Sequence, residues 1–217
     1  LVFQPLIGAL FVCLVRGETT LVATNARAVG LWSTGISLAI SCFLWVQFDR
    51  SVGDFQFLEQ KDWIPSLGIS YSMGIDGISI IFIILTSFLT FICILASWES
   101  IADRVREYMV AFLIMESMML GSFCALDTVL FYIFFEGLLV PMFIIIGIWG
   151  GPGRVHATLK FFLYTLAGSV FFLVAILVIY LKAGSTHIPT LMGAVFPLDV
   201  QLWLWLLIFA SFAVNGI

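Results

Sequence analysis

The chain has 217 residues, of which 62% are hydrophobic and only 10% are charged. Soluble domains carry roughly 25% charged residues, so this composition and a mean hydropathy of +1.17 exclude a soluble enzyme and predict an integral membrane protein. The formal net charge of -4 gives no reason to expect a nucleic-acid partner. The cysteines lie in separate apolar runs without C-x-x-C spacing, so we expect packing residues and neither a metal site nor a disulfide framework. They are Cys13, Cys42, Cys93 and Cys124.

A membrane-spanning helix needs about 20 apolar residues to cross a hydrocarbon core about 30 Å thick. The sequence contains apolar runs of this kind in succession, of which the first and the last are short. We therefore predict an all-α integral membrane protein, a polytopic bundle of about seven transmembrane helices that forms a single domain over residues 1–217. The first run is already under way at Leu1, so we expect part of the first helix to be missing or to start irregularly. The runs are residues 2–15, 28–48, 78–98, 108–126, 128–149, 158–181 and 200–214.

Short loops predict that neighbouring helices pack as antiparallel hairpins. Alternate loops then lie on opposite sides of the membrane, and the side richer in Lys and Arg is predicted to be the inner one. This puts the N-terminus and an outer loop at about 49–74 on the outer side. The predicted inner set is Arg16, Arg27, Arg104, Arg106, Arg154 and Lys160, and the predicted outer set is Arg50, Lys61 and Lys182.

Two aspartates stand where helices are expected to begin. Asp76 precedes the run at 78–98, and Asp127 lies in the tight turn before the run at 128–149. A carboxylate at such a position can accept hydrogen bonds from the free N–H groups of the first turn and complement the helix dipole. We predict a capping role for both residues.

Glu136 stands in a run of more than twenty almost uncharged apolar residues. A charged residue at the centre of a membrane helix costs roughly 2.5–3.5 kcal/mol, and such groups typically carry protons or ions. Pro141, five residues later, removes one backbone hydrogen bond and is expected to kink the helix and open room for water near the acid. The alternatives are a fixed structural contact for Glu136 and plain helix shape for Pro141.

Glu116 lies midway along the run at 108–126. With a rise of 1.5 Å per residue and a turn near Asp127, its carboxyl is expected within roughly 5 Å of the membrane depth of Glu136. If the two helix faces converge, the carboxylates cannot both ionise cheaply, so the pair can hold and release one proton. The alternative is that each acid contacts a basic group or a hydroxyl on a neighbouring helix.

Lys160 begins the run at 158–181 on the predicted inner side. A lysine near a helix end normally extends its ammonium group to the interface. The alternative is a relay cation at the start of a polar track toward Glu136, in which Thr165 and Ser169 continue on a related face.

Several stretches closely resemble one known family. They are residues 73–79 (MGIDGIS), 134–147 (FFEGLLVPMFIIIG) and 160–169 (KFFLYTLAGS), and the string FASFAV at 209–214 extends the match. The chain resembles subunit 4 of respiratory NADH:ubiquinone oxidoreductase, complex I, from Leu31 onward. The spacing of Glu136, Pro141 and Met142 is similar to that of subunit 4 rather than of subunits 2 or 5.

The resemblance implies an antiporter-like fold of about fourteen transmembrane helices, of which this chain would be the N-terminal half, and it implies proton translocation. In the family, a glutamate that matches Glu136 pairs with a lysine on the seventh helix. A fourth-helix glutamate that matches Glu116 also takes part, and a basic residue that matches Lys160 tunes the pair. NADH, FMN, iron–sulfur clusters and ubiquinone belong to other subunits, so this chain is expected to bind no cofactor and to have other membrane-arm subunits and membrane lipid as partners.

The chain departs from the family where the seventh-helix lysine is expected, because Asn215 stands there and the sequence ends two residues later. We expect a split gene in which a separate chain supplies the remaining helices of subunit 4; a truncated chain with only a structural or assembly role is the alternative. A subunit of a cation/proton antiporter complex is a further alternative. The expected location is the mitochondrial inner membrane, with a bacterial plasma membrane as the alternative.

Overall fold

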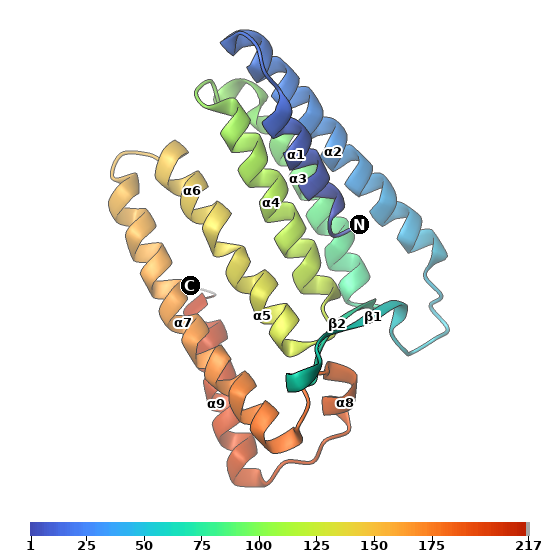
Figure 1. Ribbon diagram of the computed structural model, residues 1–217. Helices are drawn as coiled ribbons and strands as arrows, with labels where there is room; N and C mark the ends of the chain where they lie inside the picture. The colour runs from blue at the N-terminus through green and yellow to red at the C-terminus, as the bar shows by residue number, and fades with distance from the viewer. Residues whose placement is uncertain (216–217) are drawn as a thin grey trace.

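The computed structural model describes residues 1–215, and helices form most of it (Figure 1). The helices are α1 (Gln4–Leu14), α2 (Thr19–Gln47), α3 (Ser79–Ser100), α4 (Val105–Cys124), α5 (Thr128–Gly137), α6 (Leu139–Trp149), α7 (Arg154–Ala183), α8 (Ile188–Met192) and α9 (Leu198–Asn215). Five helical stretches, with α5 and α6 taken together, are long and apolar enough to cross a membrane, and α1 and α9 are shorter apolar helices. Each predicted run coincides with helix, which confirms the predicted helical membrane bundle.

Helix α4 lies at the centre of the bundle, where it contacts α1, α2 and α3 on one side and α5 and α6 on the other (Figure 1). Helix α7 packs against α5 and α6, and α9 packs along α7. Buried apolar side chains around Ile83 and Leu120, and around Ile94 and Met109, fill the interior of the α1–α4 group. The helices α7 and α9 form an outer layer.

The loops alternate between two ends of the bundle, as the hairpin prediction requires (Figure 1). The α1–α2, α3–α4 and α6–α7 loops lie at one end, which carries the arginine-rich set. At this end Arg27 donates from Nη2 to the carbonyl of Ile101 over 2.7 Å and ties α2 to the α3–α4 loop. The assignment of this end to the inner side of the membrane stays a prediction.

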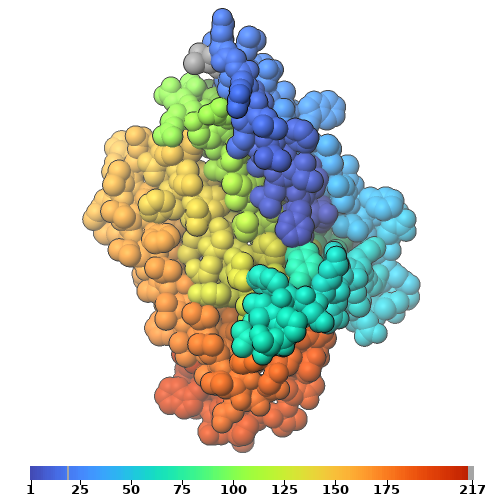
Figure 2. All heavy atoms as spheres, viewed as in Figure 1, coloured from blue at the N-terminus to red at the C-terminus, as the bar shows by residue number. Residues whose placement is uncertain are grey.

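The predicted outer loop at 49–74 contains a β-hairpin that the sequence analysis did not predict. Strand β1 (Gln56–Ile64) pairs antiparallel with β2 (Ile69–Ile75), and a short 3-10 turn joins them. Most of β1 is exposed, whereas the second half of β2 is buried. A Cβ atom on Gly74 would lie 2.6 Å from Cδ1 of Leu126, so β2 lies directly on the α4–α5 turn. Figure 2 shows the hairpin on the surface of the molecule, beside the N-terminal segment.

The α4–α5 turn lies between β2 and the segment that leads into α8. The N–H of Leu126 donates to the carbonyl of Ser72 over 2.8 Å, and the N–H of Ile188 donates to the carbonyl of Leu126 over 2.8 Å. Backbone groups that are buried need such partners, because an unpaired one costs about as much as a lost hydrogen bond. Three segments far apart in the sequence are thus joined by main-chain hydrogen bonds at the predicted outer end.

Asp127 holds this junction together from its centre. It is fully buried, and its Oδ1 accepts hydrogen bonds from the N–H groups of Val129 at 2.9 Å and Leu130 at 3.3 Å. Its Oδ2 accepts from Oγ1 of Thr186 over 2.6 Å. Asp76 likewise accepts from the N–H of Ser79 over 2.7 Å at the start of α3. Both predicted capping roles are confirmed.

We expect Asp127→Ala to lower the free energy of unfolding by about 2–4 kcal/mol, because it removes a helix cap and leaves the Thr186 hydroxyl without its charged acceptor. Denaturant unfolding in detergent micelles, followed by circular dichroism, measures the change. Asp54→Ala is the matched control, since Asp54 is exposed in the predicted outer segment. Equal stability of the two variants would contradict the role of Asp127.

Candidate functional site

Glu116 lies on the face of α4 that points into the α1–α4 group. The residue is 0% exposed, and neither carboxyl oxygen has a hydrogen-bond partner among the described residues. The polar side chain beside it is Ser37 of α2. An acid in this position has no fixed partner and can take up or release a proton without breaking an ion pair.

The hydroxyl of Ser37 is itself part of a short chain of polar groups. Ser37 donates to Oε1 of Gln4 on α1, and Nε2 of Gln4 donates to Oγ of Ser33 over 3.3 Å. Because Ser37 gives its proton to Gln4, the lone pairs of its oxygen remain free for another donor. A protonated carboxyl at Glu116 is such a donor.

Glu136 lies in the last turn of α5 and is half-buried. Its Oε1 is buried and has no hydrogen-bond partner within residues 1–215. Ser169 of α7 lies beside the carboxyl, and so does Tyr132, one turn earlier on α5. The hydroxyl of Ser169 donates to the carbonyl of Leu166 over 2.9 Å, so its oxygen can also accept from a protonated acid.

The helix is interrupted directly after Glu136. Helix α5 ends at Gly137 and α6 begins at Leu139. Pro141 lacks an N–H group, so the carbonyl of Gly137, four residues earlier, loses its normal helical partner. The next helical bond, from the N–H of Met142 to the carbonyl of Leu138, is long at 3.4 Å. The carboxyl of Glu136 therefore stands beside backbone that is less than fully hydrogen-bonded.

Close packing of α4 on α5 brings the two acids to neighbouring levels of the bundle. A Cβ atom on Gly121 would lie 2.4 Å from the Phe134 ring, and one on Gly137 would lie 2.9 Å from Sδ of Met118. Gly137 follows Glu136, and Met118 is two residues, or about 3 Å of helix rise, from Glu116. The carboxyls nonetheless face different neighbours, Ser37 of α2 for one and Ser169 of α7 for the other.

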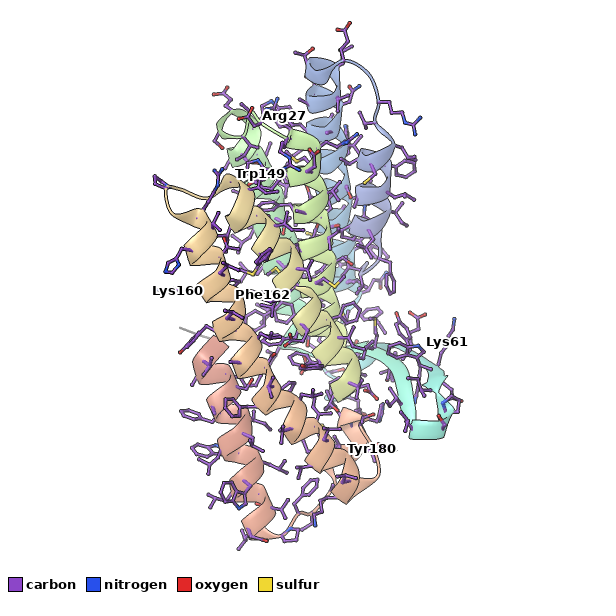
Figure 3. All side chains as sticks on the ribbon, turned by 60° about the vertical axis from the view of Figure 1, so that its left-hand side comes forward. Arg27, Lys61, Trp149, Lys160, Phe162 and Tyr180 are labelled. Carbon is purple, nitrogen blue, oxygen red and sulfur yellow. The ribbon has the colours of Figure 1, made fainter. Side chains whose placement is uncertain are left out.

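Lys160 is exposed on α7, and Figure 3 shows it on the outer side of the bundle. Helix α7 begins earlier than predicted, at Arg154, so Lys160 lies in its second turn rather than at its start. The ion pair found within the described chain is Arg106 with Glu107 at 3.9 Å, and none joins Lys160 to either acid. Thr165 and Ser169 of the expected polar track are both buried.

Helix α9 reaches the same region as Glu136. The ring of Phe212 on α9 lies edge-on to Phe135 with centroids 6.3 Å apart, and it also contacts Phe172 of α7 at 5.6 Å. Asn215 follows one turn later on α9, and its side chain lies outside the described part of the structure. The position where the resemblance implies a lysine is therefore on a helix that contacts the neighbour of Glu136.

Within residues 1–215, His, Cys, Asp and Glu side chains form no group of three or more that could hold a metal ion. The cysteines are free thiols; Cys124 is buried, and Cys13, Cys42 and Cys93 are exposed on apolar helices. Glu116 and Glu136 are thus single carboxyls rather than members of such a group.

Two family models match consecutive parts of the chain. Residues 19–126 match the amino terminus of NADH-ubiquinone oxidoreductase chain 4, and residues 125–215 match the transmembrane region of NADH:quinone oxidoreductase and Mrp antiporters. Chain 4 of Marchantia polymorpha is 43% identical over 99% of this chain and 43% of its own length. The chain belongs to the NADH-ubiquinone oxidoreductase chain 4 family. NADH-quinone oxidoreductase subunit M of Rickettsia prowazekii is also 43% identical, over 99% of this chain and 44% of its own length.

Solved structures of membrane complexes contain chains with a similar fold. Respiratory complex I from Thermus thermophilus contains a chain with a TM-score of 0.82 and 27% identity, over 99% of this chain and 42% of that one. The Mrp complex from a Dietzia species has a TM-score of 0.77 at 16% identity, over 99% of this chain and 22% of that one, and shows likeness of fold alone. The chain spans less than half the length of the chain 4 relatives it matches.

The polar side chains near Glu116 were not predicted from the sequence. Ser33, Ser37 and Ser41 recur every four residues along α2, which places them on one helix face. All three are buried toward the bundle. This spacing was visible in the sequence, but nothing in it showed that Gln4 of α1 and Glu116 of α4 would meet that face.

We expect Gly121→Ala to destabilise the chain by roughly 1–3 kcal/mol, because the added methyl group forces the Phe134 ring, and with it α5, away from α4. Phe134→Leu in the same chain should recover part of the loss. Unfolding in detergent micelles measures both. Gly151→Ala is the control, since no atom lies within 4 Å of its built Cβ. A Gly121→Ala variant as stable as this control would show that the two helices are not in contact there.

Proposed function

We propose that this chain is a proton-translocating, antiporter-like subunit of the membrane arm of complex I, and that Glu136 is its central proton-binding acid. The observation that carries the proposal is the buried, unpartnered oxygen of Glu136 beside a broken helix in a membrane-spanning segment. Burying an ionisable group in a membrane-spanning segment costs free energy, and such groups typically belong to proton relays.

Glu116 is the second proton-binding acid in this proposal. Its carboxyl and that of Glu136 lie at neighbouring levels of α4 and α5 but open onto different polar groups. This arrangement suits two separate proton stations rather than one shared proton. A proton bound at one acid changes the electrostatic field at the other, because charges in a low-dielectric interior interact over longer distances than in water.

Lys160 acts as a modulator from a distance. It is exposed on α7 toward the predicted inner end, and no ion pair within the described chain fixes it to an acid. Ser169 lies nine residues, or about 13.5 Å of helix rise, further along α7, and it is buried on the opposite face. The charge of Lys160 would therefore act on Glu136 through its electrostatic field rather than by contact, and a positive charge favours the ionised form of an acid.

Other chains complete the site. The outward faces of α7 and α9 leave large apolar side chains exposed, and these same two helices border the Glu136 region. We assign that face to a separate chain that carries the remaining helices of subunit 4 and supplies the cation that Asn215 does not provide. The remaining partners are further membrane-arm subunits and membrane lipid. The exposed side chains include Leu163, Val170, Val174, Leu177, Leu202 and Phe209.

In this proposal, the redox chemistry is carried out by other subunits of complex I. NADH, FMN, iron–sulfur clusters and ubiquinone are assigned to other subunits, as the resemblance to chain 4 implies. We place the chain in the mitochondrial inner membrane. Bacterial relatives are as similar as plant ones, at 43% identity, so a bacterial plasma membrane is the alternative location.

A cation/proton antiporter subunit is the second candidate function. The observation that favours it is the match of residues 125–215 to a model shared by quinone oxidoreductases and Mrp antiporters. Sodium-dependent transport would support it. The match of residues 19–126 to chain 4 supports the first candidate.

We expect Glu136→Gln to reduce proton pumping coupled to NADH oxidation by roughly tenfold or more, because the amide cannot bind and release a proton. The assembled complex in proteoliposomes, with a pH-sensitive dye, gives the measurement. Glu99→Gln, at the exposed end of α3, is the matched control and should pump normally. Normal pumping by an assembled Glu136→Gln complex would disprove the central role of Glu136 and favour a structural one.

We expect Ser37→Ala to slow pumping by about two- to fivefold, since it removes the hydroxyl oxygen that is free to accept from a protonated Glu116, whereas Glu116→Gln should slow it more. Ser41→Ala is the control. Ser41 is also buried on α2, but its hydroxyl donates to the carbonyl of Leu38 over 2.8 Å. Equal rates in Ser37→Ala and Ser41→Ala complexes would remove Ser37 from the path.

A further inference from the structure

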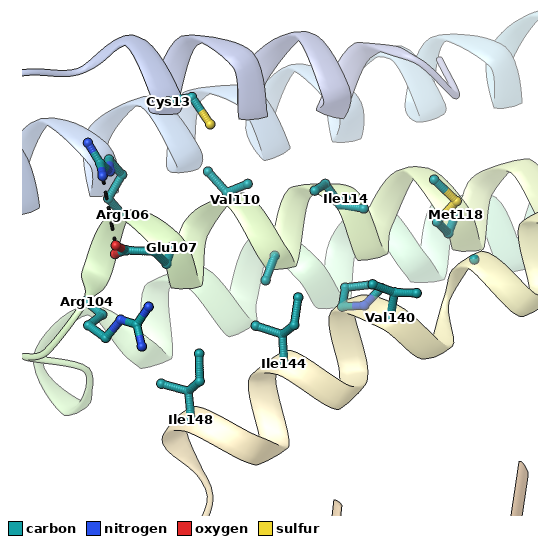
Figure 4. A pocket seen from close by; sticks show the side chains of 13 residues that line it. Cys13, Arg104, Arg106, Glu107, Val110, Ile114, Met118, Val140, Ile144 and Ile148 are labelled. Atoms are coloured by element: carbon teal, nitrogen blue, oxygen red, sulfur yellow. Dashed lines mark ion pairs between the residues drawn. The ribbon is translucent and has the colours of Figure 1, made fainter. Parts of the chain in front are cut away.

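An open groove runs along the bundle between α4 and α6, with the end of α1 at its edge (Figure 4). Its volume is about 730 Å³, within the roughly 300–1,000 Å³ of sites that hold small ligands. The walls between the helices are apolar. They are formed by Val110, Ile114 and Met118 of α4 and by Val140, Ile144 and Ile148 of α6.

The groove has the length of one leaflet of a bilayer. It extends along α4 from Glu107 to Met118, which at 1.5 Å per residue is about 17 Å. Half of a hydrocarbon core about 30 Å thick is about 15 Å. The groove therefore begins at the arginine-rich end of the bundle and stops close to the middle of the membrane.

The mouth of the groove carries a net positive charge. Arg104 and Arg106 line it together with Glu107 (Figure 4), and Arg106 pairs with Glu107 at 3.9 Å. Two cations against one anion leave an excess positive charge at the end of an apolar slot. At the same level, the indole of Trp149 donates to the carbonyl of Asp103 over 2.9 Å, in the manner of an aromatic residue at the membrane interface.

We propose that this groove binds an anionic glycerophospholipid, with one acyl chain between α4 and α6 and the phosphate between Arg104 and Arg106. The apolar walls fit a hydrocarbon chain, and basic pockets between transmembrane helices attract anionic head groups. Free phosphate would satisfy the arginines but leave the walls without an occupant. Of these ligands, only a lipid matches both the positive charge at the mouth and the apolar walls of the groove.

A helix from another chain fits the groove less well. A helical segment about 17 Å long and about 10 Å across occupies roughly 1,300 Å³, nearly twice the volume of the groove. Such a helix would rest on the rim and leave the slot between the apolar side chains unfilled. A single acyl chain can follow the slot to its end.

The end of the groove near the middle of the membrane reaches the helix break beside Glu136. Gly137 and Pro141 both line it, next to the backbone that lacks a full set of helical hydrogen bonds. An acyl chain that fills this space excludes water from that side of α5. The proposed lipid thus closes one route by which protons could leak past the acid.

A photoreactive phosphatidylglycerol with the reactive group in its acyl chain, added to phosphatidylcholine vesicles that contain the chain, tests the proposal. Cross-links should concentrate on the groove walls at Ile114, Val140 and Ile144. Labelling by the phosphatidylcholine analogue should be weaker by about fivefold for each arginine at the head group, because the choline cation cancels the charge of the phosphate. Arg104→Gln with Arg106→Gln should abolish the preference, and Val140→Trp, which obstructs the slot, should reduce labelling by both lipids.

Lys182→Gln is the charge-matched control, because Lys182 lies at the opposite end of the bundle in the last turn of α7. It should leave labelling of the groove unchanged. Equal labelling by the two lipids in the unmodified chain would overturn the proposal, and so would labelling spread evenly over the exposed faces of α3 and α7. Cross-links from the groove walls to another polypeptide in the assembled complex would show that protein occupies the site.

Discussion

The hydrogen bonding of the backbone in lipid is the constraint on which the structure depends. In a bilayer core every N–H and C=O group needs a partner within the protein, which is why nearly all the apolar runs are continuous helix. Pro141 breaks that rule at one place, the carbonyl of Gly137, and the helix divides there into α5 and α6. Close packing at Gly121 and Gly137 holds α5 on α4, and α6 also contacts α4, so both halves keep their place. Glu136 stands beside it.

The helices could be predicted because run length and apolarity are properties of the sequence alone. The hairpin at 56–75 could not, since β1 is exposed along nearly its whole length and therefore shows no alternation of polar and apolar residues. Its position is set by contacts with the α4–α5 turn, which lies far away in sequence. The helix caps at Asp76 and Asp127 were predictable because capping is local.

The types of the site residues could be predicted, but their orientation could not. An acid in an apolar run is visible in the sequence, and the level of Glu116 and Glu136 follows from counting residues. The direction in which each carboxyl points depends on how far α4 and α5 are rotated, and the contact of Gly121 with Phe134 sets that rotation. The two acids lie at neighbouring levels but face opposite groups of helices. Their spacing in the sequence was also compatible with a single pocket shared by both carboxyls.

The two ends of the bundle are joined in very different ways. At the hairpin end, main-chain hydrogen bonds link Ser72, Leu126 and Ile188 around the carboxylate of Asp127. At the opposite end, the tie between α6 and the α3–α4 loop within the described chain is the single bond from the Trp149 indole to the carbonyl of Asp103. A movement of α5–α7 relative to α1–α4 that opens this end has to break the indole hydrogen bond of Trp149 and separate its ring from Tyr108 of α4, while the hydrogen-bonded hairpin end serves as the pivot.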